Sequence, residues 1–240
     1  MLMNKIKLFL YLLFFSTLGL AQDTIIEKKK TSFRRQLKSA TKVQINQLKN
    51  GALLVCLKTK KPNIAALRKI GKNEQADQLE KKQALLNSNI IAAFKSEFNF
   101  CSTYFFFSEY TVHVKEKEFD KVVFLNDKLM PDSNIKFENK SFFVAEFGML
   151  QQDTARHFSH YSYESDKNFS KKRVSHYNGG PNQGLNGLII SSDQLIQLRH
   201  PFPYFKRTMN PMPKNVVIKR AVRKMNKRLH RFYTKKYLRN

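Results

Sequence analysis

The feature that most constrains the fold is a long stretch of helical periodicity between two short apolar runs. Residues 52–57 (ALLVCL) and 102–107 (STYFFF) are dominated by apolar and aromatic side chains, which is typical of buried strands. Between these runs, apolar residues recur at three or four residues or their multiples, at Leu79, Leu86, Ile90, Phe94 and Phe98. This order predicts a βαβ crossover, in which the two strands pair in parallel with a right-handed connection.

Other segments complete the predicted sheet. Asn50-Gly51 separates the run 43–48 (VQINQL) from residues 52–57, and Asn-Gly between two strand-like runs predicts a β-hairpin. A short helix is predicted to begin at Pro62 and Asn63 and to end at Gly71. Further strands are predicted at residues 111–115, 121–125, 141–147, 187–191 and 194–198.

The order of these elements predicts an α+β fold, which can also be described as mixed α/β. Residues 102–107 are apolar on both faces, so they are predicted to form a central, fully covered strand. Because no long helices separate the later strands, part of the sheet is expected to be antiparallel. We therefore predict a mixed β-sheet with one long βαβ crossover helix and a basic amphipathic helix near the C-terminus.

The first 21 residues predict a secretory signal peptide. Lys5 and Lys7 precede an uncharged stretch from Leu8 to Ala21, which is shorter than the ~20 residues that a membrane-spanning helix needs. Gly19 and Ala21 have the small side chains that signal peptidase accepts, so cleavage is expected after Ala21. We therefore expect an exported chain, either periplasmic or secreted. An uncleaved membrane anchor is the alternative.

The remaining chain is predicted to contain one folded domain. We assign residues 22–42 to a basic leader segment, 43–213 to a single globular domain and 214–240 to a C-terminal helix. The leader is expected to be a tail or a short amphipathic helix, because three apolar residues have helical spacing: Ile26, Phe33 and Leu37. A hydrophobic content of 42% is too high for a disordered chain.

The chain is strongly basic, and its charge is unevenly distributed. Without Lys5 and Lys7 it has 42 Lys and Arg residues against 18 Asp and Glu, a net charge of +24. From Arg199 onward there are 14 basic residues and no acidic residue, so more than half of this charge lies in that segment. Such a distribution favours anionic partners, including phosphate-bearing head groups, acidic polysaccharide and acidic proteins. Alternatively, the charge serves only solubility.

Residues 215–238 predict a basic amphipathic helix. Its apolar stripe consists of residues spaced by four, three, four and three positions: Ile218, Val222, Met225, Leu229 and Phe232. The residues predicted to bind an anionic partner cover the other faces: Lys219, Arg220, Arg223, Lys224, Lys227, Arg228, Arg231 and Lys235. The helix could lie on an anionic membrane surface or dock its stripe on the domain. The narrow stripe, which lacks Trp, favours docking.

Residues 151–166 (QQDTARHFSHYSYESD) contain the best candidate for a metal site. In a helix, Asp153, His157, His160 and Glu164 would share one face and could hold a divalent metal that activates water for hydrolysis. The stretch lacks the Glu beside the first His that defines the metalloprotease helix. Its alternating aromatic residues also fit an extended segment, in which these side chains would point apart. We expect no other cofactor.

Several other features are interpreted as structural. The glycine-rich residues 176–187 lack the P-loop and dinucleotide-binding patterns and are predicted to form a loop. Cys56 and Cys101 would lie near opposite ends of parallel strands, about 13 Å apart, beyond the ~7 Å that a disulfide spans. Both are therefore predicted to be core residues, and a disulfide, the alternative, would need non-adjacent strands or an unusual register. Three isolated histidines are given no functional role: His113, His200 and His230.

Two functional hypotheses follow. In the first, the chain is a non-enzymatic envelope or secreted protein that engages an anionic envelope component or an acidic protein, with peripheral membrane contact as one form of this. Nucleic acid is disfavoured as a partner, because only Tyr233 and Tyr237 offer stacking rings among the C-terminal cations. In the second, the chain is a metal-dependent hydrolase that uses the residue 153–164 cluster.

Overall fold

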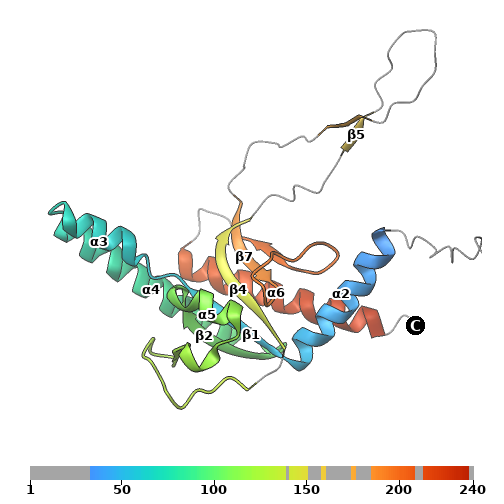
Figure 1. The fold of residues 1–240 in the computed structure, drawn as a ribbon, viewed down its shortest axis with the longest axis horizontal. Helices are drawn as coiled ribbons and strands as arrows, with labels where there is room; N and C mark the ends of the chain where they lie inside the picture. The colour runs from blue at the N-terminus through green and yellow to red at the C-terminus, as the bar shows by residue number, and fades with distance from the viewer. Residues whose placement is uncertain are drawn as a thin grey trace, which may run out of the picture. The chain divides into compact units, whose positions relative to one another are not determined.

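The computed structural model describes residues 33–138, 141–150, 158–160, 174–176, 185–208 and 213–237. The chain divides into two compact units, residues 1–36 and 37–240. The helix α2 (Phe33–Asn50) begins in the first unit and continues into the second. Residues 33–36, at the start of this helix, are the described part of the first unit. The second unit contains the remaining elements (Figure 1).

A mixed sheet of six strands forms the centre of the second unit, as far as the structure describes it, with the order β3-β2-β1-β4-β7-β8. These strands are β1 (Ala52–Leu57), β2 (Ser102–Phe107), β3 (Phe124–Leu125), β4 (Phe142–Met149), β7 (Asn186–Ser191) and β8 (Phe205–Arg207). β1 pairs in parallel with β2 and β4, whereas the pairs β2–β3, β4–β7 and β7–β8 are antiparallel. The predicted α+β fold with a mixed sheet is therefore confirmed. A separate antiparallel pair consists of β5 (Phe158–His160) and β6 (Val174–His176).

The predicted crossover between residues 52 and 107 is present. β1 leads into α3 (Lys61–Lys69) and α4 (Asn73–Glu97), which is followed by β2. Ala52 lies opposite Ser102 in the parallel register, and Leu57 lies opposite Phe107. α3 ends where predicted, because Gly71 has a φ of +75°, a left-handed conformation that favours glycine.

The central strand is β1 rather than β2, which corrects the prediction for residues 102–107. All six residues of β1 are buried, because β2 and β4 flank it. β2 is partly exposed at Ser102, Thr103 and Tyr104, because β3 is only two residues long and pairs with Phe105 and Phe106 alone. The prediction was wrong because the aromatic residues of this strand suggested that both of its faces are covered along its whole length.

The hairpin predicted around Asn50-Gly51 is wrong. Residues 43–48 belong to α2, where Ile45 and Leu48 are buried at helical spacing and Val43 is 53% exposed. Gly51 instead marks a close approach of two backbones. A Cβ atom on Gly51 would lie 2.2 Å from the carbonyl oxygen of Ser141 and 2.6 Å from that of Gln47.

Two other predicted strands are also wrong, and a third is shorter than predicted. Residues 111–115 lie in α5 (Thr111–Glu116), where Val114 is buried and Val112 is 59% exposed. Residues 194–198 form a turn with a single bridge between Ser191 and Gln197, and the Ser192 hydroxyl accepts hydrogen bonds from two backbone N–H groups in this turn. In the segment 121–125, only Phe124 and Leu125 pair as a strand, β3, because Lys121 ends a 3-10 helix, η2 (Phe119–Lys121).

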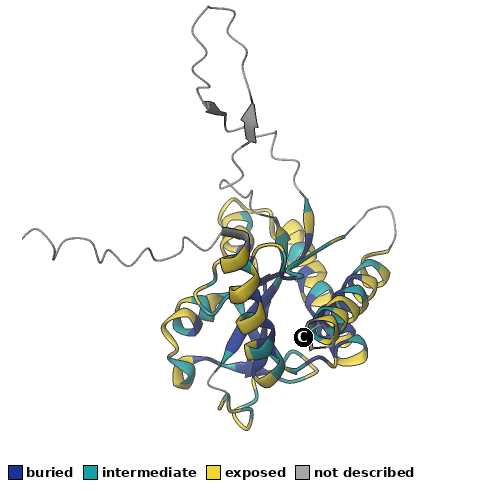
Figure 2. Ribbon diagram, turned by 90° about the vertical axis from the view of Figure 1, so that its right-hand side faces the viewer, coloured by how far each residue is buried: buried dark blue, intermediate teal, exposed yellow. Residues whose placement is uncertain are grey.

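The sheet buries apolar side chains on both faces. On one face, Leu53, Val55 and Leu57 of β1 pack with residues of α2, α4 and α6 (Lys214–Tyr237). On the other face, Leu54 and Cys56 pack with α5 and with the segment after β3. Figure 1 shows α5 and α6 on different sides of the sheet, and the buried strands are dark blue in Figure 2. No helix in the described ranges has a stretch apolar enough to cross a bilayer.

Candidate anion-binding surface

α6 docks its apolar stripe on the sheet, as the periodicity predicted. Val222, Met225 and Leu229 are fully buried, and Ile218 is 4% exposed. These residues belong to the same core cluster as β1 and α4, and Phe232 packs against it. Complete burial of each such side chain contributes about 1.5–3 kcal/mol. Moving the stripe onto a membrane would expose to water the apolar side chains of β1 and α4 that it covers, so the stripe serves the core.

Glu97, at the C-terminal end of α4, engages two of the cations on α6. The guanidinium of Arg223 donates hydrogen bonds of 2.7 and 2.8 Å to the two carboxylate oxygens of Glu97. The Lys219 ammonium lies 3.6 Å from Glu97 Oε1. The Glu97 side chain is 14% exposed. The hydrogen bond from Arg223 lowers the pKa of Glu97 more than partial burial raises it, so the carboxylate is ionised at neutral pH.

The other cations of α6 form no ion pair with a carboxylate within the described ranges. Arg220, Lys227, Arg231 and Lys235 are exposed, and Lys224 is half-buried. A hollow of about 450 Å³ lies along part of this helix, lined by Val216, Lys219, Arg220, Arg223, Lys224 and Lys227. Arg228 donates a 3.2 Å hydrogen bond to the Phe205 carbonyl oxygen, which is a neutral acceptor. Among the described residues, the positive charge of this surface is therefore only partly compensated by carboxylates.

The structure adds Lys206 of β8 to these cations, a residue that the sequence did not single out. Its side chain is half-buried, and β8 contacts α6. Burial, together with the positive charges of Arg228, Lys224 and Arg220, lowers the pKa of Lys206. Two elements thus bring four cations together, with no carboxylate paired to any of them in the described part of the chain. We call Lys206, Arg220, Lys224 and Arg228 the cationic cluster.

The sequence-predicted metal site falls largely outside the described residues. Asp153, His157 and Glu164 are not described. His160 is the last residue of β5, so the backbone at residues 158–160 is extended rather than helical, which matches the extended alternative. The glycine-rich residues 176–187 are described only at His176 and from Leu185 onward. The metal-site hypothesis therefore stays a prediction.

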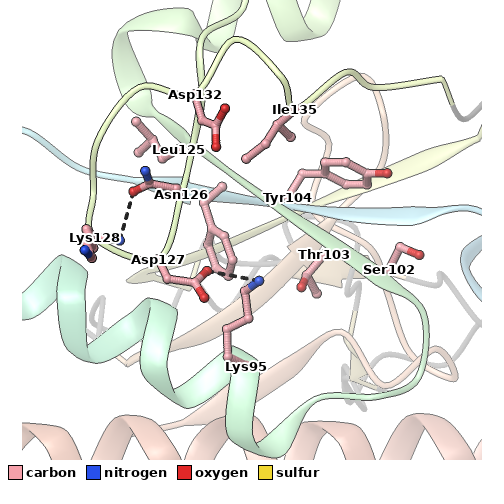
Figure 3. A pocket seen from close by; sticks show the side chains of 11 residues that line it. Lys95, Ser102, Thr103, Tyr104, Leu125, Asn126, Asp127, Lys128, Asp132 and Ile135 are labelled. Atoms are coloured by element: carbon pink, nitrogen blue, oxygen red, sulfur yellow. Dashed lines mark hydrogen bonds and ion pairs between the residues drawn. The ribbon is translucent and has the colours of Figure 1, made fainter.

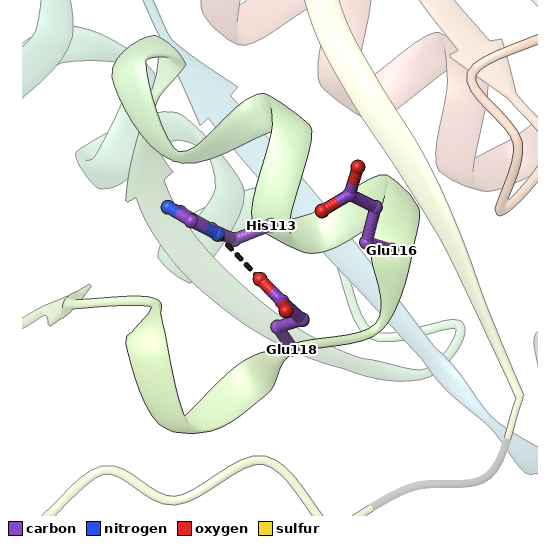
Figure 4. A group of neighbouring side chains, drawn as sticks. All are labelled: His113, Glu116 and Glu118. Carbon is purple, nitrogen blue, oxygen red and sulfur yellow. Dashed lines mark hydrogen bonds and ion pairs between the residues drawn. The ribbon is translucent and has the colours of Figure 1, made fainter.

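His113, for which no role is predicted from the sequence, lies beside two carboxylates (Figure 4). Suitable ligand atoms of His113, Glu116 and Glu118 all lie within 4.8 Å of one another. However, Glu118 already contacts His113 Nδ1 at 2.8 Å and the Lys121 ammonium at 2.8 Å. These hydrogen bonds, first that from Lys121, lower the pKa of Glu118. The group is thus explained as a local ion-pair network at the end of α5.

A hollow of about 620 Å³ lies at the exposed edge of β2 (Figure 3). Lys95 of α4 reaches across to Asp127 with a 3.0 Å ion pair, and Asn126 Oδ1 accepts hydrogen bonds from the backbone of the turn that follows β3. Ser102 and Thr103 border the hollow where β3 no longer covers β2. Its charged residues include both signs, in contrast to the cationic cluster.

The two cysteines are free thiols. Cys56 lies opposite Phe106 in the parallel register, whereas Cys101 precedes Ser102 at the other end of β2, so the predicted offset is confirmed. Burial, and to a smaller extent the Glu146 carboxylate, raises the pKa of Cys56 to about 11. Burial raises the pKa of Cys101 to about 12. Both thiols are therefore protonated at neutral pH and lack the thiolate that an activated nucleophile requires.

Comparisons with known protein families, curated proteins and solved structures gave no match. A functional argument therefore depends on the chemistry of the described residues. Among these, the surface formed by α6 and β8 is distinguished by its concentration of cations without acidic partners.

Proposed function

We propose that this chain is an exported, non-enzymatic protein that binds an anionic surface or partner of the cell envelope through the outward cations of α6. The first 21 residues would be removed after Ala21 during export. Peripheral contact with anionic lipid is one form of this binding, and contact with an acidic polysaccharide or protein is another.

The observation that carries the proposal is that α6 has separate structural and charged faces. Its apolar stripe is buried in the core, while Arg220, Lys227 and Arg231 face solvent without a carboxylate partner among the described residues. Because the stripe fixes the helix on the domain, these cations are held in a constant arrangement. Each basic residue close to an anionic lipid surface contributes about 1 kcal/mol, so several together suffice for reversible binding.

Sedimentation with lipid vesicles tests this proposal. The mature chain is expected to bind vesicles that contain phosphatidylglycerol at low ionic strength, to leave vesicles of phosphatidylcholine unbound, and to be released as salt approaches ~0.5 M. The triple substitution Lys224→Met, Lys227→Met and Arg231→Met is expected to abolish most of the binding. An acidic polysaccharide column provides a second anionic surface.

A matched control separates position from total charge. Lys115, Lys128 and Lys136 are exposed and belong to segments outside α6. Their replacement by Met removes the same three charges and is expected to leave vesicle binding nearly unchanged. Binding that is indifferent to salt, or equally weakened by both triple substitutions, would contradict the proposal.

Export is tested separately. Expression of the full chain in a bacterial host should yield a mature protein that begins at Gln22, detected by intact mass and N-terminal sequencing of the fractionated cells. A chain recovered in the cytosol with residues 1–21 intact would argue against export while leaving the binding measurement valid.

A further inference from the structure

The cationic cluster differs from an ordinary basic helix face, because a strand contributes to it. Arg220, Lys224 and Arg228 are four residues apart on α6, so they follow one line along the helix surface. Lys206 approaches this line from β8, on the sheet. Arg228 also donates to the carbonyl oxygen of Phe205, which immediately precedes Lys206. This hydrogen bond ties the Arg228 side chain to the strand that carries Lys206.

The cluster brings like charges into mutual electrostatic range, and no carboxylate of the described ranges pairs with them. Lys219 and Arg223, on a neighbouring part of the same helix, share Glu97. By contrast, no carboxylate in the described residues pairs with Lys206, Arg220 or Lys224. Partial burial and, after it, the positive charges of Arg228, Lys224 and Arg220 lower the pKa of Lys206, so a bound anion would stabilise the charged form of this lysine. The docked stripe of α6 prevents the helix from moving away to relieve this repulsion.

The number and kind of donors in the cationic cluster favour one type of anion. A phosphate monoester carries between one and two negative charges at neutral pH and has three free oxygen atoms. Guanidinium groups bind such oxygens with paired N–H donors, and ammonium groups add point charges. A phosphodiester has a single charge and two free oxygens, and a carboxylate has one charge. The monoester therefore satisfies more of the four cations than either of these anions.

We infer that Lys206, Arg220, Lys224 and Arg228 form a discrete binding site for a phosphate monoester. The inference rests on the proposed anion-binding function and specifies its ligand. The monoester belongs either to a lipid head group or to a soluble phosphorylated molecule such as a sugar phosphate. Both sources present the same terminal phosphate, and the experiment distinguishes them.

Titration calorimetry with the mature chain provides the test for soluble ligands. Glucose 6-phosphate is expected to bind at least about tenfold more tightly than dimethyl phosphate, because of its additional charge and oxygen. Lys206→Met is expected to weaken glucose 6-phosphate binding by about tenfold, since it removes a charge-assisted contact. Lys206→Arg, which keeps the charge, is expected to retain most of the binding. Lys115→Met, on the opposite side of the sheet, serves as the charge-matched control.

Vesicles test the lipid source. Vesicles with phosphatidic acid, a monoester, are compared with phosphatidylglycerol vesicles of the same total negative charge. Preferential binding to phosphatidic acid that is lost in Lys206→Met, without binding of glucose 6-phosphate, assigns the site to a lipid head group. Binding of both assigns it to the terminal phosphate irrespective of its source.

Two results would overturn the inference without affecting the proposed function. The first is equal affinity for monoester and diester ligands, and the second is unchanged monoester binding in Lys206→Met. In both cases, salt-sensitive binding to phosphatidylglycerol vesicles would still support a general anionic partner. If Lys206→Met does not fold, NMR of ¹³C-methylated lysines in the unsubstituted protein replaces it. If no lysine resonance then shifts on addition of glucose 6-phosphate, the inferred site is overturned.

Discussion

Glu97 determines which of the α6 cations remain available to a partner. It is nearly enclosed by Arg223, Lys219 and the end of α4, and its lowered pKa shows that the folded state stabilises its ionised form. The pair is therefore both a link between α4 and α6 and a local neutralisation of the basic helix. Removing this one carboxylate should separate these two effects.

We predict that Glu97→Gln reduces the stability of the protein and strengthens its binding to anionic vesicles. The pKa of Glu97 is lower in the folded state than the usual value of 4.5, so its contribution is complete above that value and is lost as the pH falls through the folded pKa. Thermal unfolding between pH 3 and pH 7 should thus show a steeper acid loss in the unsubstituted protein than in Glu97→Gln. Weaker vesicle binding by Glu97→Gln would contradict the proposed role of the cations.

Substitutions of Gly51 and Gly71 by Ala should cost stability for different reasons, the first steric and the second conformational. In Gly51→Ala, the new Cβ would overlap two carbonyl oxygens, at 2.2 and 2.6 Å, so we expect a loss of about 1–3 kcal/mol or more in the free energy of unfolding. Gly71 has no atom within 4 Å of the position of a Cβ but has a φ of +75°. Gly71→Ala should therefore cost about 1–2 kcal/mol from strain alone. Urea denaturation measures both, and a Gly51→Ala variant as stable as the parent would show that the backbones can separate.

At the scale of elements, α6 is a structural part of the core as well as a charged surface. We predict that Leu229→Ala lowers the free energy of unfolding by about 2–5 kcal/mol, because it leaves a cavity at a fully buried position. Leu85→Ala on α4 is the matched control. Leu85 is 64% exposed, and its replacement should change stability by less than about 0.5 kcal/mol. Equal effects in urea denaturation would mean that the stripe of α6 is not packed as described.

The elements that could be predicted from the sequence are those whose periodicity extends over several turns or whose neighbours along the chain are also their neighbours in space. α4 and α6 have four or more turns of consistent apolar spacing. The parallel pairing of β1 with β2 follows from the helical crossover that connects these two strands. Residues 43–48 and 111–115 were mispredicted because alternating and helical spacing coincide over five or six residues. The contacts of Ile45, Leu48 and Val114 decide between the two, and these are long-range.

The candidate site was predictable only in part for the same reason. The cations of α6 follow from its sequence, whereas Lys206 joins them through the contact of β8 with α6. Its signal in the sequence is a basic residue in an extended aromatic segment just before a basic helix, which is too general to identify a site. Similarly, nothing local to α6 indicates that Glu97, more than 120 positions earlier, pairs with Arg223.

At the scale of the whole molecule, the surplus of positive charge opposes folding through self-repulsion. The mature chain would have a net charge of +24. Raising sodium chloride from ~0.01 to ~0.15 M shortens the Debye length from about 30 to about 8 Å. We therefore predict that the melting temperature rises by a few degrees over this range, measured by circular dichroism. A fall would show that ion pairs such as Glu97–Arg223 outweigh the repulsion.

The position of α6 in the chain has a consequence for how the protein is made. One face of the sheet is closed by a helix that begins at Lys214, after every strand of that sheet. During synthesis from the N-terminus, the apolar side chains of β1 and β4 on that face lack their final cover until these late residues emerge. A ribosome stalled before residue 214 would carry an incompletely folded chain with exposed apolar surface, which chaperones that bind unfolded chains should capture.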